Sequence, residues 1–322
     1  MKPQTRTLVL HLGVLALLFA LQFVLPAYHH GIMARIMVLA VFAMGYNLLF
    51  GYTGLLSLGH AMFFSAGLYG AGLTVYHLGW SVPAALAAGL AAGVALSALV
   101  GLLALRTSGV AFMIVTMMFG QVFYLLTLQF GDWTRGEEGL TLAASLRVLG
   151  PLDLTNPTTR YFAALALFAI VLLATLKVVR APFGRVLVAI RENEERTRML
   201  GYDTFLNKLG ATILSGTICA AAGAVYALLF GYFGSTFATV QYSILPLLWV
   251  LVGGAATTLG PFLGTLAMYY LVDISNDVLN SRFPGWDISY LGIVGAALIL
   301  LILFFPKGLL GTIRQRWVPW LP

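Results

Sequence analysis

The chain has 322 residues, of which 60% are hydrophobic and 9% charged, and its mean hydropathy is +0.94. Ordinary globular proteins are about half apolar and about one quarter charged, so this composition argues against a soluble domain. The net charge of +7 comes from cations in a few short segments between apolar runs, which argues against nucleic-acid binding. The single cysteine, Cys219, leaves no intrachain disulfide and no cysteine-based metal site, and no histidines have metal-ligand spacing.

Long uncharged apolar runs recur along the whole chain. Each is long enough to cross about 30 Å of hydrocarbon at about 1.5 Å per residue. The sequence therefore predicts an all-α polytopic membrane protein that forms a single transmembrane domain over residues 1–322. The eighth run is short and interrupted by glycine, so we expect nine to ten crossings. The predicted spans are residues 8–26, 32–50, 60–78, 82–105, 109–130, 160–179, 209–230, 240–255, 261–280 and 286–305.

The first apolar run, Leu8 to Leu25, is too long for the apolar part of a secretion signal, and no A-x-A site follows it. We therefore expect it to remain as the first helix. Cytoplasmic loops of membrane proteins are rich in lysine and arginine. With a cytoplasmic N-terminus and ten spans, thirteen of the eighteen lysines and arginines fall inside, so both termini are expected in the cytoplasm. Only two loops have any size, an outer one at about residues 131–159 and a cytoplasmic one at about residues 180–208.

The cytoplasmic loop contains the most highly charged stretch of the chain, with eight charged side chains between Gly184 and Asp203. Its pattern predicts a helix from Pro182 to Gly201, which is placed to end the helix in the left-handed conformation. Such a helix is too polar to span and marginal alone in water, so it is either a solvated connector or a docking helix for a soluble partner. Its apolar flank is Val186, Leu187 and Ile190. Pairs of opposite charge at i,i+4, each worth about 0.3–0.5 kcal/mol, are Arg191 with Glu195, Glu192 with Arg196, and Glu194 with Arg198.

Glycines interrupt two of the apolar stretches. The first break holds Gly45, Gly51, Gly54 and Gly59, and the second lies at residues 253–261. In lipid, such breaks persist only where protein or a water-filled cavity covers the freed backbone groups, while small residues also let helices pack closely. Two interpretations therefore stay open. One is close packing; the other is a broken helix that lines a solute path, with hydrogen bonds from Asn47, Ser57 and His60.

Five stretches in chain order resemble the branched-chain amino-acid permeases of bacterial ABC importers, in particular the M-type of their two permease subunits. Together they cover most of the chain from about residue 45 to 311. Two departures are Ala256, where the family pattern has glycine, and the unusually charged residues 195–198. The matching stretches are Asn47 to His60 (N-x-x-x-G-x-x-G-x-x-S-x-G-H), Thr134 to Leu140 (T-x-G-x-x-G-[LI]), Gly184 to Gly201 (G-R-x-L-x-A-I-R-[ED]-x-E, then L-G), Gly253 to Pro261 (G-G-x-G-[TS]-x-x-G-P) and Pro306 to Leu309 (P-[RK]-G-L).

The resemblance implies one subunit of a larger importer in the bacterial plasma (inner) membrane, surrounded by lipid. A second permease subunit would complete the path for branched-chain or related neutral amino acids. Two ABC ATPase subunits would bind ATP and drive transport, and an extracytoplasmic solute-binding protein would deliver the solute. This chain has no G-x-x-x-x-G-K-[ST] loop, so no cofactor is expected on it.

The resemblance also implies roles for individual residues. The cytoplasmic helix would couple the permease to the ATPases, the glycine-rich breaks would line the solute path, and the charged outer loop would contact the binding protein. The coupling residues are Gly184, Arg185, Ala189, Ile190, Arg191, Glu192, Glu194 and Gly201. The path residues are Asn47, Gly51, Gly54, Ser57, Gly59, His60, Gly253 and Gly254. The contact residues of the outer loop are Arg135, Glu137 and Glu138.

Two other functions remain open. Urea or amide permeases of the same family have very similar sequences. A secondary transporter driven by an ion gradient would need carboxylates in the membrane, and Asp273 and Asp277 lie four residues apart on one helical face, toward the outer end of their span. An enzyme is not indicated, because no nucleophile–base or metal-ligand arrangement occurs in the sequence.

Overall fold

The computed structural model describes residues 3–150, 152–282, 290–305 and 307–316. Residues 286–289 of the last predicted span, and Pro306, lie outside these ranges. Within them the chain forms ten helices of 14 to 27 residues, one for each predicted span. They are α1 (Pro3–Val24), α2 (Ala27–Asn47), α3 (His60–Leu78), α4 (Val82–Ala104), α5 (Gly109–Gln129), α7 (Pro157–Arg180), α10 (Thr204–Phe230), α11 (Val240–Gly253), α12 (Gly260–Arg282) and α13 (Tyr290–Phe304).

Six of the described helices, α1, α2, α4, α5, α7 and α10, are long and apolar enough to cross a membrane by length and composition alone. The prediction of an all-α polytopic membrane protein is therefore confirmed. Helix α11 has only 14 residues, or about 21 Å at 1.5 Å per residue, which is shorter than the hydrocarbon core of a bilayer. Glycines at its end, rather than a lack of apolar residues, limit its length.

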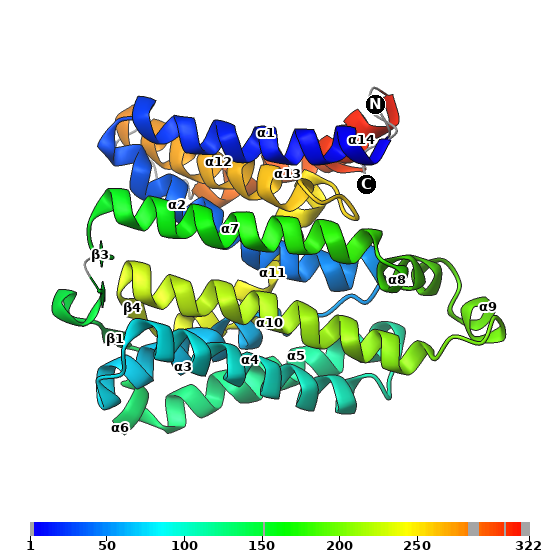
Figure 1. The fold of residues 1–322 in the computed structure, drawn as a ribbon, viewed down its shortest axis with the longest axis horizontal. Helices are drawn as coiled ribbons and strands as arrows, with labels where there is room; N and C mark the ends of the chain where they lie inside the picture. The colour runs from blue at the N-terminus through cyan, green and yellow to red at the C-terminus, as the bar shows by residue number, and fades with distance from the viewer. Residues whose placement is uncertain (1–2, 151, 283–289, 306, 317–322) are drawn as a thin grey trace.

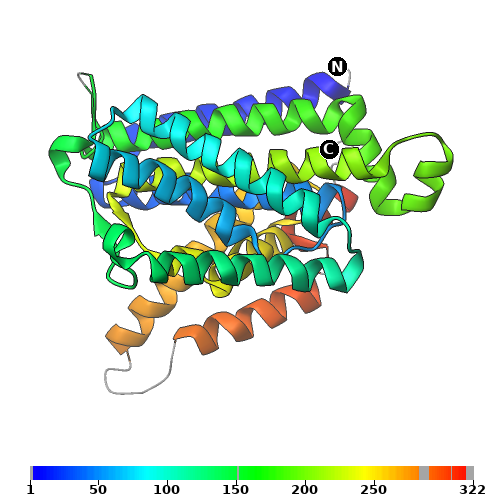
Figure 2. The ribbon, with the colours of Figure 1, turned by 90° about the horizontal axis from the view of Figure 1, so that it is seen from below.

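The long helices run up and down along one direction of the molecule (Figure 1). At one end lie α8 (Pro182–Glu192) and α9 (Glu194–Met199), together with the start of α1 and with α14 (Gly308–Arg316). The view from below shows that the segment holding α8 and α9 projects beyond the rest of the bundle (Figure 2). We call this end, which carries the charged loop, the α8–α9 end, and the opposite end the outer-loop end.

Helix α2 lies at the centre of the bundle. Of its apolar span 89% is buried, against 22% for α1, 28% for α4 and 17% for α5. It packs against α7, α10, α11 and α12. The peripheral helices present large apolar side chains on the outside, as expected for surfaces that contact lipid or another subunit.

Helices α3, α4 and α10 pack at close range through small residues. A Cβ atom at Gly67 would collide with the carbonyl oxygen of Ala220, and one at Gly223 would collide with the carbonyl oxygen of Phe64. Glycine on both sides of the contact lets the two backbones touch, which is how helices associate where lipid supplies no hydrophobic driving force.

At the outer-loop end, short elements connect the long helices: α6 (Gly131–Thr134), η2 (Ala144–Leu146) and a hairpin of β2 (Val148–Leu149) with β3 (Leu152–Asp153). Strand β1 (Leu140–Thr141) pairs antiparallel with β4 (Tyr232–Phe233), with Leu140 opposite Phe233. The pairing ties the outer loop to the chain that leaves α10. From β4 the chain enters a 3-10 helix, η3 (Ser235–Ala238), which contacts α3 and α5.

Candidate functional site

The first glycine-rich break lies between α2 and α3. Helix α2 ends at Asn47, and the next five residues form a π-helical turn, η1 (Leu48–Tyr52). Gly54 follows with φ +78°, a left-handed conformation that favours glycine. The chain then has no regular structure until α3 begins at His60. The predicted helix interruption is therefore present, and π-turns of this kind are frequent at functional sites.

The second break lies between α11 and α12, and Asn47 joins it to the first. The side-chain amide of Asn47 donates to the carbonyl oxygen of Thr257 at 2.9 Å, and its Oδ1 accepts from the backbone N–H of Ala256 at 3.0 Å. Gly51 lies against this amide: a Cβ atom there would collide with Oδ1 of Asn47 and lie 2.7 Å from the nitrogen of Ala256. Asn47 is buried, so its hydrogen bond to Thr257 is shielded from water, whereas its hydrogen bond to Ala256 is partly buried.

Ala256 has φ +56°. Alanine in the left-handed region costs about 1–2 kcal/mol because its Cβ approaches the following carbonyl oxygen. The family pattern has glycine at this position, so the departure noted in the sequence falls on a residue whose conformation favours glycine.

The second break also contacts α1 and α14. In α1, Nδ1 of His11 lies 2.7 Å from the carbonyl oxygen of Thr7, which requires Nδ1 to donate, so Nε2 accepts from the hydroxyl of Thr258 at 2.7 Å. At the start of α14, a Cβ atom on Gly308 would lie 2.5 Å from the nitrogen of Gly254. Gly254 and Gly308 both have positive φ, +115° and +73°, which lets these two turns lie against each other. Helix α1 and the start of α14, which lie near opposite ends of the chain, therefore both contact the second break.

Helix α8 begins one residue after α7 ends and folds back against it. Gly184 makes this possible, because a Cβ atom there would lie 2.5 Å from the carbonyl oxygens of Val178 and Val179. The predicted apolar flank is buried: Val186, Leu187 and Ile190.

Arg191 lies between α8 and the first break. Its guanidinium donates to the carbonyl oxygen of Gly51. The Cγ, Cβ and Cα atoms of Arg191 lie 2.8, 3.3 and 3.4 Å from where a Cβ atom on Gly54 would be. The sequence grouped Arg191 with the residues that face a soluble partner. The structure shows that Arg191 is exposed and that its guanidinium also connects the cytoplasmic segment to the π-turn.

The prediction of one continuous helix from Pro182 to Gly201 is wrong. Helix α8 ends at Glu192, Asn193 is extended (φ −160°, ψ 103°), and α9 begins at Glu194. The side chain of Asn193 accepts from the backbone N–H of Arg196 at 2.8 Å and so caps α9. Two of the predicted ion pairs span this break and are not formed among the described residues: Arg191 with Glu195, and Glu192 with Arg196.

The third predicted pair is present. Glu194 lies 3.6 Å from Arg198, and a second cation that sequence spacing did not suggest, Lys208 of α10, lies 2.6 Å from the same carboxylate. Burial raises the pKa of Glu194, but the hydrogen bond and charge of Lys208 outweigh it, so the pKa lies below its usual value. After α9 the chain turns at Gly201, whose φ of +90° confirms the predicted left-handed end.

The outward side of this segment carries an exposed groove of about 310 Å³ between α8 and α9. Two of the predicted coupling residues line it, Arg185 and Ala189, together with Leu200 and Tyr202. Leu200 is 72% exposed, and the neighbouring Met199 is 86% exposed. The sequence had used Leu200 only as part of a motif. Met199 and Leu200 are adjacent apolar residues in an otherwise charged segment, and this pattern could have predicted a contact surface.

Of the predicted path residues, Ser57 and Gly59 are explained by packing. The Ser57 hydroxyl accepts from the backbone N–H of Gly59 at 3.3 Å, and a Cβ atom on Gly59 would collide with the carbonyl oxygen of Thr116 in α5. Gly253 is similar, because a Cβ atom there would collide with the carbonyl oxygen of Gly260. These contacts favour the close-packing interpretation for the three residues.

His60 is different. Its Nε2 lies 3.0 Å from the Ser215 hydroxyl, which itself donates to the carbonyl oxygen of Gly45 at 2.6 Å, so Nε2 must donate and Nδ1 must accept. No hydrogen bond reaches Nδ1 in the described part of the chain, and the hydroxyl of Tyr46, whose ring lies 4.6 Å from the imidazole, has none either. Unsatisfied buried polar groups cost about 1–3 kcal/mol each, so this pair needs a reason beyond packing.

The predicted binding-protein contacts Arg135, Glu137 and Glu138 are all exposed at the outer-loop end. The hydroxyl of Thr134 fixes their position by donating to the carbonyl oxygen of Thr127 at 2.6 Å. Gly139 completes the turn, since a Cβ atom there would lie 2.8 Å from the carbonyl oxygen of Phe233. The residues Thr134 and Gly139 of the family motif therefore fix the position of the exposed charges between them.

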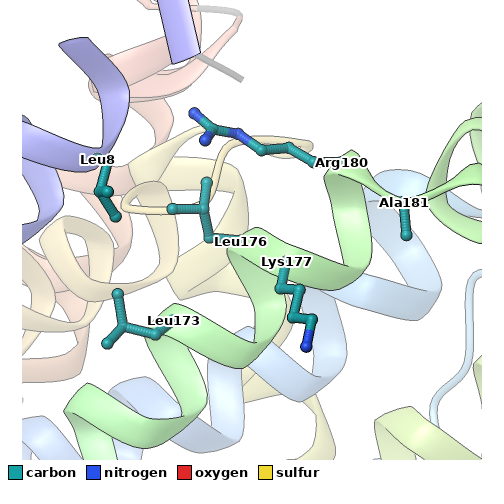
Figure 3. Close-up of a pocket in the computed structure, with 6 residues that line it drawn as sticks. All are labelled: Leu8, Leu173, Leu176, Lys177, Arg180 and Ala181. Atoms are coloured by element: carbon teal, nitrogen blue, oxygen red, sulfur yellow. The ribbon is translucent and has the colours of Figure 1, made fainter. Parts of the chain in front are cut away.

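A separate groove of about 490 Å³ lies between α1 and the end of α7 (Figure 3). Its walls are leucines and its ends carry cations, with Lys177 and Arg180 pointing in different directions. None of its lining residues belongs to either break. The residues that line it are Leu8, Leu173, Leu176, Lys177, Arg180 and Ala181.

Residues 29–303 match the family described as branched-chain amino acid transport system / permease component. The chain is 27% identical over 306 residues to the high-affinity branched-chain amino acid transport system permease protein LivM of Salmonella typhimurium, covering 87% of this chain and 69% of that protein. It is 31% identical over 144 residues to the probable branched-chain amino acid transport permease protein LivM of Methanocaldococcus jannaschii, 42% of this chain and 41% of that one.

Another relative is the autoinducer 2 import system permease protein LsrC of Salmonella typhi, which is 28% identical over 192 residues, 57% of this chain and 52% of that protein. No solved structure matches the chain. The family match extends from α2 into α13 and so includes both helix breaks and the α8–α9 segment. The chain therefore belongs to the family of branched-chain amino acid transport system permease components.

Proposed function

We propose that this chain is a transmembrane permease subunit of an ABC importer for branched-chain or related neutral amino acids. It forms the solute path together with a second permease subunit, in the bacterial plasma membrane with both termini in the cytoplasm. Separate ATPase subunits supply the energy, and an extracytoplasmic binding protein supplies the solute. The observation that carries this proposal is the α8–α9 segment, which is anchored inside the bundle and exposes apolar side chains outside it.

The two sides of the segment have different tasks in this proposal. The exposed groove with Arg185, Ala189, Leu200 and Tyr202 is the surface that fits an ATPase. Covering Leu200 alone would bury most of an apolar side chain, worth about 1.5–3 kcal/mol when complete. The buried side holds the segment to the bundle through Val186, Leu187 and Ile190, so α8 moves as a body with its surroundings.

Motion of α8 would reach both breaks through a short chain of contacts. Arg191 is bonded to the carbonyl oxygen of Gly51, Gly51 packs on the Asn47 amide, and Asn47 is bonded to Ala256 and Thr257. A displacement of α8 therefore acts on the π-turn and on the start of α12 together. Both breaks would then change shape in one step, which is what alternating access at paired interruptions requires.

His60 and Tyr46 give this path its polar lining. Their unsatisfied atoms, Nδ1 and the hydroxyl, would find partners in a solute or in water when the path opens. At the outer-loop end, Arg135, Glu137 and Glu138 would meet the binding protein, where exposed charges chiefly set association rate and salt dependence.

The test is solute uptake by proteoliposomes that contain the whole importer. ATP-driven uptake of leucine, isoleucine or valine supports the proposal, and uptake of urea or of autoinducer 2 instead would assign a different solute. Uptake that persists on an ion gradient without ATP would overturn it. In the same assay, reversing both charges at Arg191 and Glu192 is expected to uncouple ATP hydrolysis from uptake, and normal uptake by that variant would remove the coupling role.

A further inference from the structure

Arginine side chains gather around the end of α10 at the outer-loop end. The guanidinium carbon of Arg35, from α2, lies 4.9 Å from the centre of the Phe230 ring, and that of Arg160, from α7, lies 5.5 Å from the same ring. Arg147 donates to the carbonyl oxygen of Leu229 at 3.3 Å. Three positive charges from three parts of the chain therefore meet at one helix end.

Two of these charges have polar partners. Arg147 has the carbonyl at the negative end of α10. Arg160 donates to the carbonyl oxygen of Thr155 at 3.3 Å and feels the charge of Asp153. Both residues lie at the outer-loop end and are half-buried, and the Nε atom of each has no hydrogen-bond partner among the described residues.

Arg35 hydrogen-bonds to the hydroxyl group of Tyr269 but has no anionic partner in the described part of the chain. Among the described residues, no carboxylate lies within ion-pair distance of it. Its neighbours are the Phe230 ring and the hydroxyl groups of Tyr226, Tyr242 and Tyr269. It is half-buried and lies eight residues, or about 12 Å, inside α2. A cation at that depth without an anion is costly and marks a functional site by default.

The same region holds the richest aromatic cluster of the described residues. Most of the rings meet edge to face or tilted, and Phe42 is stacked on Tyr242; the centroids lie 4.6–6.1 Å apart, and the rings come from α2, α3, α10, β4, η3 and α11. The cluster starts beside Arg35 and runs toward Tyr46 and His60, because Arg35, Phe42 and Tyr46 share one face of α2. Its members are Phe42, Phe64, Tyr226, Phe230, Tyr232, Phe237 and Tyr242.

Open space lies beside Gly31, on the outer-loop side of Arg35. Gly31 lies one turn before Arg35 on the same face of α2, and the space beside its Cα is empty to 4 Å. A small solute arriving there meets an arginine first and apolar rings next. That order suits a molecule with a carboxylate at one end and an aliphatic side chain at the other, because arginine pairs with carboxylates and the rings bury methyl groups.

We propose that Arg35 binds the carboxylate group of the transported amino acid and that the aromatic cluster receives its side chain. This assignment rests on the proposed importer function. In it, Arg35 and the rings form an entry site, and the solute passes along α2 to the polar pair of Tyr46 and His60. A solute without a carboxylate is a poor ligand for this site.

The test compares Arg35→Gln and Arg35→Lys with the control Arg160→Gln, which removes a charge from the same ring. In proteoliposomes of the whole importer, leucine uptake should fall about ten- to a hundredfold in Arg35→Gln, which is the worth of one charge-assisted hydrogen bond. Leucine uptake by Arg35→Lys should lie between that of Arg35→Gln and that of the wild type. Uptake by Arg160→Gln should stay within about twofold of the wild type. ATP hydrolysis stimulated by the binding protein should remain, because the α8–α9 segment is untouched.

A second measurement separates binding from folding. The purified complex without binding protein is heated with millimolar leucine or with leucinamide, which lacks the carboxylate. Leucine should raise the melting temperature of the wild type but not that of Arg35→Gln. Leucinamide should leave the melting temperatures of both proteins unchanged. Equal uptake by wild type and Arg35→Gln, or equal stabilisation of the wild type by leucinamide, overturns the Arg35 site alone. Absence of any ATP-driven amino-acid uptake by the wild type overturns the importer function itself.

Discussion

Replacement of Gly54 by alanine tests whether the cytoplasmic segment acts on the first helix break. Gly54 has φ +78°, so alanine there costs about 1–2 kcal/mol in backbone strain. Its Cβ would also lie 2.8 Å from Cγ and 3.3 Å from Cβ of Arg191. Because Cβ is fixed to the backbone of α8, the helix itself must shift by a few tenths of an ångström. Overpacking of this kind adds about 1–3 kcal/mol, for a total of about 2–5 kcal/mol.

The expected result is a change in coupling as well as in stability. Displacing α8 stretches the bond between Arg191 and the carbonyl oxygen of Gly51, so ATP hydrolysis should continue while the number of leucine molecules imported per ATP falls. The assay is parallel measurement of ATP hydrolysis and leucine uptake in proteoliposomes of the whole importer, with the melting temperature measured on the same preparation.

Gly109 offers a matched control. It has φ +58°, yet nothing lies within 4 Å of the position of its Cβ. Gly109→Ala therefore pays the same backbone strain of about 1–2 kcal/mol without touching α8. If Gly54→Ala and Gly109→Ala lose the same stability and keep the same ratio of leucine to ATP, the contact between Gly54 and Arg191 transmits nothing and the reasoning fails.

Three further changes test other contacts. Ala256→Gly removes left-handed strain of about 1–2 kcal/mol and adds about 0.4–1 kcal/mol of unfolded-chain entropy, so the melting temperature of the purified complex should rise by about 1–3 °C. Asn47→Ala leaves the buried C=O of Thr257 without its partner and removes one hydrogen bond from the half-buried Ala256, so it should cost about 2–4 kcal/mol in the same measurement. The lowered pKa of Glu194 means that its carboxylate stabilises α9 fully above its unfolded pKa of about 4.3, and that this contribution disappears as pH falls through the lower folded value. Proteolysis of α9 should therefore accelerate below that range in the wild type, and Glu194→Gln should lack this pH dependence.

Each of these has an outcome that contradicts it. An unchanged or lower melting temperature in Ala256→Gly would mean that position 256 carries no strain. Wild-type stability in Asn47→Ala would mean that the two breaks are held together by other contacts. A proteolysis profile shared by the wild type and Glu194→Gln would show that the carboxylate near Lys208 does not hold α9.

The charged segment shows where sequence reasoning succeeds and where it fails. Its apolar flank and its glycine end follow from helical periodicity and from the conformational freedom of glycine, and both are confirmed at Leu187 and Gly201. The continuous helix is wrong because two exposed ion pairs of about 0.3–0.5 kcal/mol each compete with an asparagine cap worth about 1 kcal/mol. At Asn193 the cap forms and the pairs do not.

The amino-acid sequence by itself determined the all-α membrane-spanning class, the positions of its apolar helices and the resemblance to the permease family. These features follow from the length of the apolar runs, compared with the thickness of a bilayer, and from local sequence motifs. Neither depends on which helices pack against each other. The tertiary structure decided that Asn47 joins two breaks, that Arg191 donates to the carbonyl oxygen of Gly51, and that Arg35 meets no described carboxylate. Helical spacing fixes which residues share a face of a helix, but which face meets another helix, and whether a charge finds its counterion there, depends on segments far away in the chain.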